Sequence, residues 1–501
     1  MPPSSATSEH VDVLIIGAGL SGIGAAHHLL ERCPNRSVLL LEARDAIGGT
    51  WDLFRYPGIR SDSDMYTFGY RFRPWTGDKT LADGPAILQY IRATAKEAGI
   101  DRLIRFGHRV VRAEWSSEAE RWTVSFQTRD SDALQRITAG FVYNCSGYYR
   151  FDEGYTPDFP HIDDYAGTVI HPQHWPEDLD YTGKKVVVIG SGATAVTLVP
   201  AMAETAGHVV MLQRSPTYVA TLPATDAIAI ALRRWLPEGL AYRLTRWKNV
   251  LRSIYIYEMS QRYPEKVKDY LRGELVAQLP DGYPVDVHFK PRYDPWDQRL
   301  CAVPDGDLFA AICEGRASVV TDTIARFTEE GILLDSGEEL EADIIVTATG
   351  FTLQMLGGAE LVVDGEPVVF SEHMTYKGMM LSDVPNSAFT VGYTNSSWTL
   401  KADLVSEYVC RLLNYMEAEG YSVQVPQGDP TVTGRPLLDF GAGYVQRSIQ
   451  QLPMQGDRWP WKLRMNYAAD VLSLRHGPLE DGTMVFRCPG ASTTSWSRRG
   501  S

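Results

Sequence analysis

Apolar and polar residues near the N-terminus follow the pattern of a strand, a turn, a helix and a second strand. Residues 11–16 (VDVLII) form a short, mostly apolar run, which is typical of a strand buried on both faces of a parallel sheet. Residues 17–22 are rich in glycine, and residues 22–33 (GIGAAHHLLERC) have the pattern of a helix. A second apolar run, Val38–Leu41, ends on Glu42. This order predicts a parallel β-α-β unit.

The glycines of this unit have the spacing of a dinucleotide-binding motif. Gly17 permits a tight turn, Gly19 lets the backbone approach a pyrophosphate, and Gly22 allows close packing of the helix on the strand. The helix N-terminus would face phosphates, and Glu42, 25 residues after Gly17, would accept hydrogen bonds from ribose hydroxyls. The alternative is a glycine-rich turn in a unit that binds no nucleotide. The complete order of strand, motif, helix, strand and acid favours the nucleotide site.

The same pattern occurs again between Lys185 and Arg214. The strand KVVVIG leads into residues 190–195 (GSGATA), a helix predicted to continue through residue 207 (VTLVPAMAETAG) and a second strand, HVVML. This strand ends in Gln213 and Arg214 instead of an acid, and a guanidinium can pair with a 2′-phosphate that a carboxylate would repel. We therefore expect a nucleotide with a free ribose in the first unit and NADPH, in preference to NADH, in the second. Two such units indicate a flavin that receives electrons from a nicotinamide, unless one unit is a silent duplicate.

Between residues 222 and 279 the pattern changes to apolar residues at helical spacing. Residues 223–275 contain ten Lys or Arg and six Asp or Glu, in a chain whose net charge is −14. Two interpretations remain open: a helical insertion that covers the active site, or a basic amphipathic surface that associates weakly with anionic membrane. Elsewhere, the apolar strands at residues 141–147 and 341–351 resemble those that carry the chain between the two nucleotide domains of flavoproteins.

Composition narrows the class of protein further. At about 150 residues per domain, 501 residues suggest about three domains or lobes, and 44% hydrophobic with 22% charged residues is typical of soluble globular proteins. The net negative charge disfavours nucleic acid as a partner. No apolar run has the length of a membrane helix, and the first ten residues lack the segments of a secretion signal. Six widely spaced cysteines without a CxxC pair argue against a metal centre or a disulfide scaffold and fit a reducing cytoplasm.

Residues 165–176 (YAGTVIHPQHWP) resemble the FxGxxxHxxxWP fingerprint of type I Baeyer–Villiger monooxygenases, with Tyr165 in place of Phe. Flavin-containing monooxygenases share the first part of this fingerprint but usually carry Tyr or Phe where Trp175 and Pro176 stand here. Segments such as residues 48–75 and GYTNSSWTLKADLVSE extend the resemblance over essentially the whole chain, which looks most like the ethionamide-activating group of FAD-containing monooxygenases. The resemblance, and not the spacing, implies oxygen chemistry. NADPH would reduce FAD, and a C4a-peroxyflavin would convert a ketone into an ester or lactone, or oxygenate a sulfide or thioamide.

The resemblance also implies which residues contact the cofactors. The residues expected to contact FAD combine the glycines of the first loop with the positions that the resemblance implies. They are Gly17, Gly19, Ser21, Gly22, Glu42, Thr50, Trp51, Asp52, Leu53, Asp62 and Val110. Those expected at NADPH are Arg60, Ser61, Asp62, Gly190, Ser191, Gly192, Ala193, Thr194, Ala195, Val196, Gln213 and Arg214. Val110 would contribute only its backbone, and the alternative for it is an ordinary core valine.

Arg299 is the candidate for the chemical step. The flavin peroxide and the adduct that it forms on a ketone are both anions, and a fixed guanidinium would stabilise each of them. Residues 298–300 are Gln-Arg-Leu where the family has Lys-Arg-Leu, so one possible contact to the 2′-phosphate is missing. Arg292 is the competing choice. Asp62 would pair with Arg299 and hold it, unless it is an exposed loop carboxylate, and His171 is expected to be structural and not a catalytic base.

Together these patterns predict an α/β fold with two Rossmann-like dinucleotide-binding domains and a helical insertion. The FAD-binding domain is assigned to residues 1–150 and to residues 351–501, which also include the C-terminal region. The NADPH-binding domain is assigned to residues 151–217 and 297–350, and the helical insertion to residues 218–296. The expected protein is a cytoplasmic Baeyer–Villiger monooxygenase that acts on a ketone or sulfide with O2. The alternatives are a flavin monooxygenase that oxidises only N or S, and a redox-sensing flavoprotein without turnover. Substrate identity and oligomeric state stay open.

Overall fold

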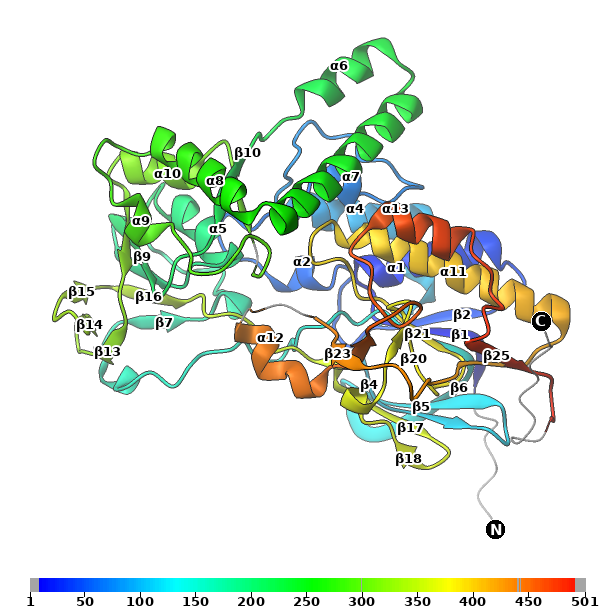
Figure 1. Ribbon diagram of the computed structural model, residues 1–501. Coiled ribbons are helices and arrows are strands. Elements are labelled where there is room, and N and C mark those ends of the chain that lie inside the picture. Colours follow the sequence, from blue (N-terminus) through cyan, green and yellow to red (C-terminus); the bar gives the residue numbers. More distant parts are fainter. Residues whose placement is uncertain (1–8, 299, 439–440, 442, 492–501) are drawn as a thin grey trace.

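The computed structural model describes residues 9–298, 300–438, 441 and 443–491, and its largest sheet lies in the lobe on the right of Figure 1. This sheet has the order β18-β17-β4-β5-β6-β1-β2-β3, and β21 pairs with the end of β6 on the edge opposite β1. β1 pairs in parallel with β2, as the apolar runs predict, and also with β6, while β4, β5 and β6 form an antiparallel meander. Two distant segments of the chain contribute the strands: β1 (His10–Ile16), β2 (Val38–Leu41), β3 (Ile104–Arg105), β4 (His108–Ser116), β5 (Arg121–Thr128) and β6 (Ser131–Asn144), then β17 (Glu360–Val363), β18 (Glu366–Pro367) and β21 (Ser387–Phe389).

Helices cover one face of this sheet. α1 (Leu20–Arg32) connects β1 to β2 and packs against α11 (Trp398–Glu419), which is buried along most of its length. α4 (Gly84–Glu97) packs against α1 and begins at Asp83, whose carboxylate accepts a hydrogen bond from the Ala86 N–H at 2.9 Å. Such a cap satisfies one of the free N–H groups of the first turn and fixes where the helix starts.

The second lobe, on the left of Figure 1, contains a five-stranded parallel sheet of order β12-β9-β8-β16-β7. All its strands come from the middle of the chain: β7 (Thr168–Ile170), β8 (Lys185–Ile189), β9 (His208–Gln213), β12 (Ala317–Thr321) and β16 (Ile344–Thr347). α5 (Ala193–Met202) joins β8 to β9 and packs on α10 (Asp307–Cys313). A three-stranded antiparallel sheet of β13 (Ile324–Phe327), β14 (Gly331–Leu334) and β15 (Glu339–Glu341) flanks this lobe. The predicted α/β fold class with two β-α-β nucleotide units is confirmed.

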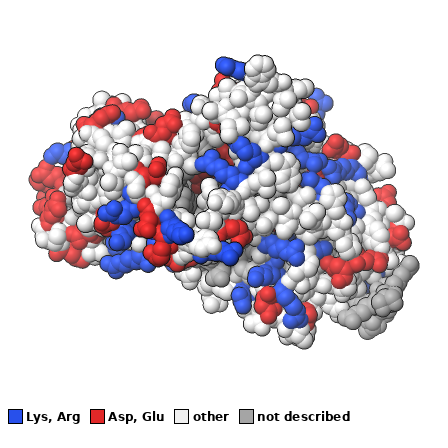
Figure 2. Space-filling view, turned by 45° about the horizontal axis from the view of Figure 1, so that its top comes forward, with Lys and Arg blue, Asp and Glu red and all other residues white. Residues whose placement is uncertain are grey.

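Between the two lobes, a mainly helical segment forms the top of the molecule in Figure 1. It consists of β10 (Val219–Leu222), α6 (Ala227–Trp235), α7 (Glu238–Arg262), α8 (Pro264–Gln278) and α9 (Val285–His288), and β10 pairs with β11 (Cys301–Pro304). α7 carries an apolar stripe of five exposed residues at the spacing of one helical face: Leu240, Leu244, Trp247, Leu251 and Tyr255. In Figure 2 the surface at the top is mostly white with blue side chains around it, while red side chains gather on the left lobe.

The chain passes between the lobes twice, after β6 and again after β16. The remaining elements are short: the helices α2 (Thr50–Leu53), α3 (Met65–Phe68), α12 (Gly443–Ser448) and α13 (Tyr467–Asp470), and the strands β19 (Thr375–Tyr376), β20 (Met380–Leu381), β22 (Val423–Pro426), β23 (Gly434–Pro436), β24 (Met454–Gly456) and β25 (Met484–Arg487). Among the described residues, no helix combines the length and apolar character that crossing a membrane requires. The domain boundaries at 150, 217, 296 and 350 stay a prediction.

Candidate active site

The first glycine loop forms a tight turn between β1 and α1. Gly17 has a positive φ of 100°, and a Cβ atom there would lie 2.8 Å from the Cys145 carbonyl oxygen. A Cβ atom on Gly22 would lie 2.0 Å from the Gly17 carbonyl oxygen, so only glycine lets the helix approach the turn. Gly19 is the N-cap of α1, and its first turn has no acidic residue. The free N–H groups of this turn therefore form a site for an anion such as a pyrophosphate.

Glu42 lies at the carboxyl end of β2, beside this turn, and is 6% exposed. One carboxylate oxygen accepts a hydrogen bond from the Ala18 N–H at 2.7 Å, and the other accepts one from the Arg44 N–H at 2.9 Å. Burial raises the pKa of this carboxyl, and the two N–H donors act in the opposite direction. Each carboxylate oxygen keeps further acceptor capacity, as a ribose hydroxyl requires.

A cavity of about 440 Å³ extends from the glycine loop and Glu42 toward a group of aromatic side chains. Nine of the predicted FAD or NADPH residues line it: Gly17, Gly19, Ser21, Glu42, Thr50, Trp51, Ser61, Asp62 and Val110. Val110 is buried in β4 and borders the cavity, so its predicted contact with FAD stays a prediction. The structure thus brings together segments that are far apart in the sequence.

Two further residues of the predicted cofactor set form ion pairs that hold the walls together. Asp52 is buried, and its carboxylate pairs with Arg44 at 2.6 Å and with Arg92 at 2.8 Å. Because Arg44 lines the cavity, Asp52 positions a cation at its edge. Arg60 pairs with Asp307 at 2.5 Å and so ties the loop after α2 to α10 of the second lobe. Leu53 packs against the core of the second lobe.

The aromatic end of the cavity contains residues that the sequence did not single out. The Trp398 indole N–H donates to the Ser21 hydroxyl at 2.8 Å, and its ring stacks on Tyr148 with centroids 5.0 Å apart and planes 11° apart. Tyr149 and Tyr393 also line this end. Trp398 lies within the segment GYTNSSWTLKADLVSE, but no local pattern places it against Ser21, 377 positions away.

The second glycine loop has a similar construction between β8 and α5. Gly190 has a positive φ of 142°, and a Cβ atom there would lie 2.4 Å from the Ala348 carbonyl oxygen. A Cβ atom on Gly192 would meet none of the described atoms within 4 Å, so a ligand can approach the backbone there. The Ser191 hydroxyl donates to the Ser215 carbonyl at 3.1 Å, and Ala193–Val196 form the first turn of α5. This turn also lacks acidic residues, as an anion site requires.

Gln213 and Arg214, at the end of β9, differ in their surroundings. Gln213 is 2% exposed, and its side-chain NH2 donates to the His288 carbonyl at 2.7 Å and to the Thr321 hydroxyl at 2.8 Å. These bonds fix the strand end to α9 and β12, so the Gln213 side chain has a structural role here. Arg214 is exposed, which leaves its guanidinium accessible to a 2′-phosphate.

The fingerprint segment anchors the crossing between the lobes. The Tyr165 hydroxyl donates to the Ala342 carbonyl at 2.8 Å, and the His171 Nε2 lies 3.2 Å from the Gly350 carbonyl oxygen. The His171 Nδ1 accepts from the Gln173 N–H at 3.1 Å, and burial lowers the pKa of this histidine. Both ring nitrogens are thus engaged, in agreement with the expected structural role.

Arg299, the predicted catalytic residue, lies outside the described residues. Asp62, its predicted partner, lines the first cavity, whereas Arg292, the competing choice, is exposed and does not line it. The part of the chain that the structure describes contains no group of three His, Cys, Asp or Glu side chains that could hold a metal ion.

Two nucleotide loops on parallel strands, with a cavity at the first, define a protein of the two-dinucleotide flavoprotein class. The chain belongs to the flavin-binding monooxygenase-like family, whose model matches residues 81–391, and residues 15–77 match an NAD(P)-binding Rossmann-like domain. It is 57% identical to the FAD-containing monooxygenase EthA of Mycobacterium tuberculosis (strain ATCC 25618 / H37Rv) over 481 residues, which cover 96% of this chain and 98% of that protein. It is 49% identical to the probable FAD-binding monooxygenase AlmA of an Acinetobacter species, over 97% of this chain and 98% of that protein.

Solved structures share the fold at low sequence identity. An oxidized steroid monooxygenase bound to NADP aligns with a TM-score of 0.70 and 24% identity, over 84% of this chain and 88% of that one. An open crystal structure of cyclohexanone monooxygenase aligns with a TM-score of 0.70 and 20% identity, over 84% and 90%.

Proposed function

We propose that the protein is an FAD- and NADPH-dependent Baeyer–Villiger monooxygenase that inserts one oxygen atom of O2 next to a ketone carbonyl to give an ester or lactone. The observation that carries the proposal is the presence of both glycine loops in one chain, joined by the fingerprint segment at the crossing between the lobes. Membership of the flavin-binding monooxygenase-like family supports the flavin, and the name of the 57% identical relative supports FAD. The same enzyme would also oxygenate sulfides or thioamides.

FAD fits the residues of the first cavity. The N–H groups at the start of α1 would bind its pyrophosphate, and Glu42 would accept hydrogen bonds from its ribose hydroxyls. Gly19 leaves the backbone open, since a Cβ atom there would meet its nearest described neighbour at 3.5 Å. When bound, FAD supplies the redox chemistry that activates O2.

NADPH fits the second loop. The start of α5 would bind its pyrophosphate, and Arg214 would bind the 2′-phosphate. Gln298 stands where the family has Lys, so we expect the preference over NADH to depend mainly on Arg214. Arg60 and Ser61 lie on the loop that the Arg60–Asp307 ion pair ties to the second lobe, where they would contact the same nucleotide.

The chain's own side chains would organise the reaction. The aromatic residues Trp51, Tyr148 and Trp398 line the cavity and would exclude water from it. Arg299 would stabilise the negative charge that develops on the oxygen during attack on the ketone, and Asp62 would orient Arg299. This assignment depends on the sequence resemblance and on the position of Asp62 in the cavity.

A substrate panel tests the proposal. Purified protein, loaded with FAD, is supplied with NADPH, O2 and linear, cyclic or aryl ketones, or with sulfides, and the products and leaked peroxide are measured. We expect an ester or lactone from at least one ketone class, with NADPH consumption matched to product. Sulfoxides or N-oxides without any ester would instead assign the protein to the N- and S-oxidising flavin monooxygenases, and the lack of steady NADPH oxidation would indicate a redox sensor.

A further inference from the structure

A second cavity, of about 550 Å³, lies away from the nucleotide loops and is unusually rich in arginine. Five arginines line it: Arg32 of α1, Arg71, Arg243 and Arg246 of α7, and Arg475. The aromatic side chains of Phe72, Trp247 and Tyr467 form other parts of its wall. Among the described residues, none lines both this cavity and the cofactor cavity, so the two are separate sites.

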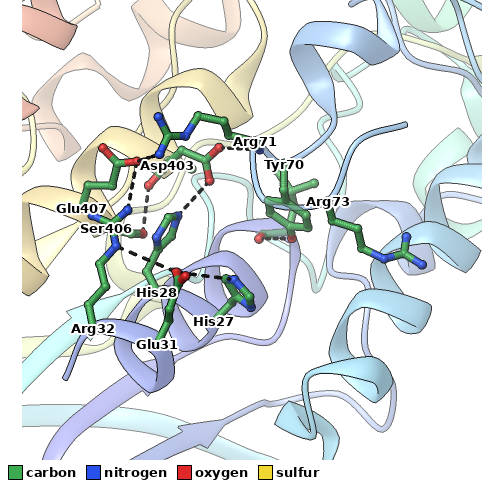
Figure 3. A network of polar contacts seen from close by, with 12 residues as sticks. His27, His28, Glu31, Arg32, Tyr70, Arg71, Arg73, Asp403, Ser406 and Glu407 are labelled. Atoms are coloured by element: carbon green, nitrogen blue, oxygen red, sulfur yellow. Dashed lines mark hydrogen bonds and ion pairs between the residues drawn. The ribbon is translucent and has the colours of Figure 1, made fainter. Parts of the chain in front are cut away.

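A single buried carboxylate of α11, that of Glu407, holds three of these arginines, of which Figure 3 shows Arg32 and Arg71. Glu407 is 1% exposed and pairs with Arg475 at 2.5 Å, and with Arg32 and Arg71 at 3.5 Å each. Three guanidinium groups that share one carboxylate keep most of their N–H donors for other acceptors, since each guanidinium has five.

The remaining charges leave the cavity with an excess of positive charge. Asp403 accepts from His28 at 3.2 Å and lies 3.7 Å from Arg246, and Glu31, which is largely exposed, lies 4.0 Å from Arg32. Glu31, Asp403 and Glu407 are the described carboxylates that pair with these arginines within 4.0 Å, so the five arginines exceed them by two charges. A dianion would balance this excess.

Two of the arginines are held on one face of α7. Arg243 and Arg246 are three residues apart, so their side chains are neighbours on the helix surface, where like charges repel. Arg246 is fixed by hydrogen bonds from Nη1 to the carbonyls of Tyr66 at 2.8 Å and Gly69 at 2.7 Å. Its Nη2 lies 3.7 Å from the Asp403 carboxylate and has no hydrogen-bond partner within the described part of the chain, so this buried donor is available to a hydrogen-bonding ligand. An anion in the cavity would offset the repulsion between the two guanidinium groups.

We propose that this cavity binds a phosphomonoester, whose dianionic phosphate lies among the arginines and whose organic part lies against the aromatic wall. Phosphate matches the excess of two charges, and a guanidinium binds its oxygens in the forked geometry that makes arginine a phosphate ligand. The phosphate has two possible sources: a soluble small molecule, or the headgroup of a lipid such as phosphatidic acid. A lipid source fits the surface around the cavity, because Trp247 lines the cavity and also belongs to the exposed apolar stripe of α7.

Titration of the FAD-loaded protein with phenyl phosphate tests the soluble source, at pH 8, where the phosphate is a dianion, and at low ionic strength. Sedimentation with phosphatidylcholine vesicles, with and without phosphatidic acid, tests the lipid source. The test variant is Arg71→Gln/Arg243→Gln, because both residues are exposed, Arg71 with 46% of its side chain accessible, and contribute little to the fold. The control is Arg102→Gln/Arg136→Gln, which removes the same charge from exposed positions away from the cavity.

We expect the test variant to weaken binding of phenyl phosphate, or of phosphatidic acid vesicles, by at least tenfold, and the control to leave it within about twofold. Glu31→Gln removes a negative charge from the cavity and should tighten binding severalfold, a result that damage to the fold would not produce. Binding of phenyl phosphate identifies the soluble source, and binding of phosphatidic acid vesicles alone identifies the lipid. If neither probe binds in a way that depends on Arg71 and Arg243, the proposal is wrong.

Discussion

Gln213 and Arg214 are neighbours along the chain but have opposite surroundings. The Gln213 side-chain NH2 donates hydrogen bonds to the His288 carbonyl and the Thr321 hydroxyl inside the second lobe. Arg214, in contrast, is exposed at the end of β9. Discrimination between NADPH and NADH depends only on the 2′-phosphate, so it should follow the accessible guanidinium and not the buried amide.

Replacement of Arg214 by Ala should raise the KM for NADPH much more than the KM for NADH. Loss of one charge-assisted phosphate contact costs about 1.5–3 kcal/mol, or roughly ten- to a hundredfold in affinity. Steady-state kinetics with both nucleotides measures the ratio. Equal effects on the two nucleotides would show that Arg214 does not contact the phosphate.

Substitution of Arg299 should distinguish oxygenation of the substrate from oxidation of NADPH without product. Arg299→Ala should retain its FAD and its fold, but loss of one preorganised donor costs about 2.7–4 kcal/mol, a rate loss of about 10²–10³. Ester formation should therefore fall below easy detection while NADPH still reduces the flavin and electrons leak to hydrogen peroxide. Arg299→Lys should rescue poorly because an ammonium lacks the planar fork.

Arg292→Ala is the matched control for this experiment, because Arg292 is an exposed arginine nearby in the sequence that does not line the cofactor cavity. It should leave ester formation largely intact. The catalytic assignment fails if Arg292→Ala abolishes the ester and Arg299→Ala does not.

For individual residues, the sequence predicts those whose role follows from their spacing within a local motif. Gly17, Gly22 and Glu42 belong to one contiguous motif, and the structure places them as the motif requires. Trp398 was missed because its contact with Ser21 depends on the packing of α11 on α1, which no local pattern encodes. The resemblance places Asp52 at FAD, which stays a prediction, and the ion pairs of its carboxylate with Arg44 and Arg92 are an additional feature that no local pattern indicates.

Among the elements, the junction of β1 and α1 is the one most sensitive to added volume. Gly22→Ala would place a methyl group 2.0 Å from the Gly17 carbonyl oxygen, so the turn or the helix has to shift. We expect a lower melting temperature and at least a tenfold weaker retention of FAD, measured by thermal unfolding and by flavin content after dialysis. Gly273→Ala is the control: it lies within α8 with open space around its Cβ position, so it should stabilise the protein by about 0.5–1 kcal/mol. Equal flavin retention in both variants would contradict the role of this junction.

The apolar stripe of α7 supports the membrane-surface interpretation of the helical segment. Residues 227–262 contain seven Lys or Arg against two Asp or Glu, so basic residues accompany the exposed Leu and Trp side chains. Leu244→Glu/Leu251→Glu should reduce sedimentation with phosphatidylglycerol vesicles by more than tenfold, because each leucine contributes up to about 1.5–3 kcal/mol when it leaves water. Leu134→Glu, an exposed leucine on β6, should have no effect. If the unmodified protein does not bind these vesicles, the stripe has another role.

Elements with regular periodicity could be predicted, and those defined by long-range pairing could not. The predicted strand Val38–Leu41 is β2, and the repeat near residue 185 forms β8, α5 and β9. The predicted helix after the second loop continued through residue 207, but α5 ends at Met202. β17 and β21 join the first sheet from more than 200 residues away, and these short strands have no pattern that assigns them to it.

For the molecule as a whole, the first cavity joins an adenosine-type site to an aromatic site. Glu42 and the start of α1 recognise ribose and pyrophosphate, which FMN lacks, while Tyr148 and Trp398 lie at the other end. The purified protein should therefore be yellow with FAD and not FMN. Extraction and chromatography of the flavin measures this, and recovery of FMN alone would contradict the assignment of the cavity.

The double crossing between the lobes has a consequence for synthesis on the ribosome. All five strands of the second sheet have been synthesised once the chain reaches Thr347. This lobe can therefore complete its sheet while translation of the remaining residues continues. The first lobe cannot, because β21 and α11 complete it and α11 ends only at Glu419. Until then, the apolar surface of α1 that α11 covers is exposed on the nascent chain. The lobe whose synthesis begins first is therefore the lobe that finishes folding last.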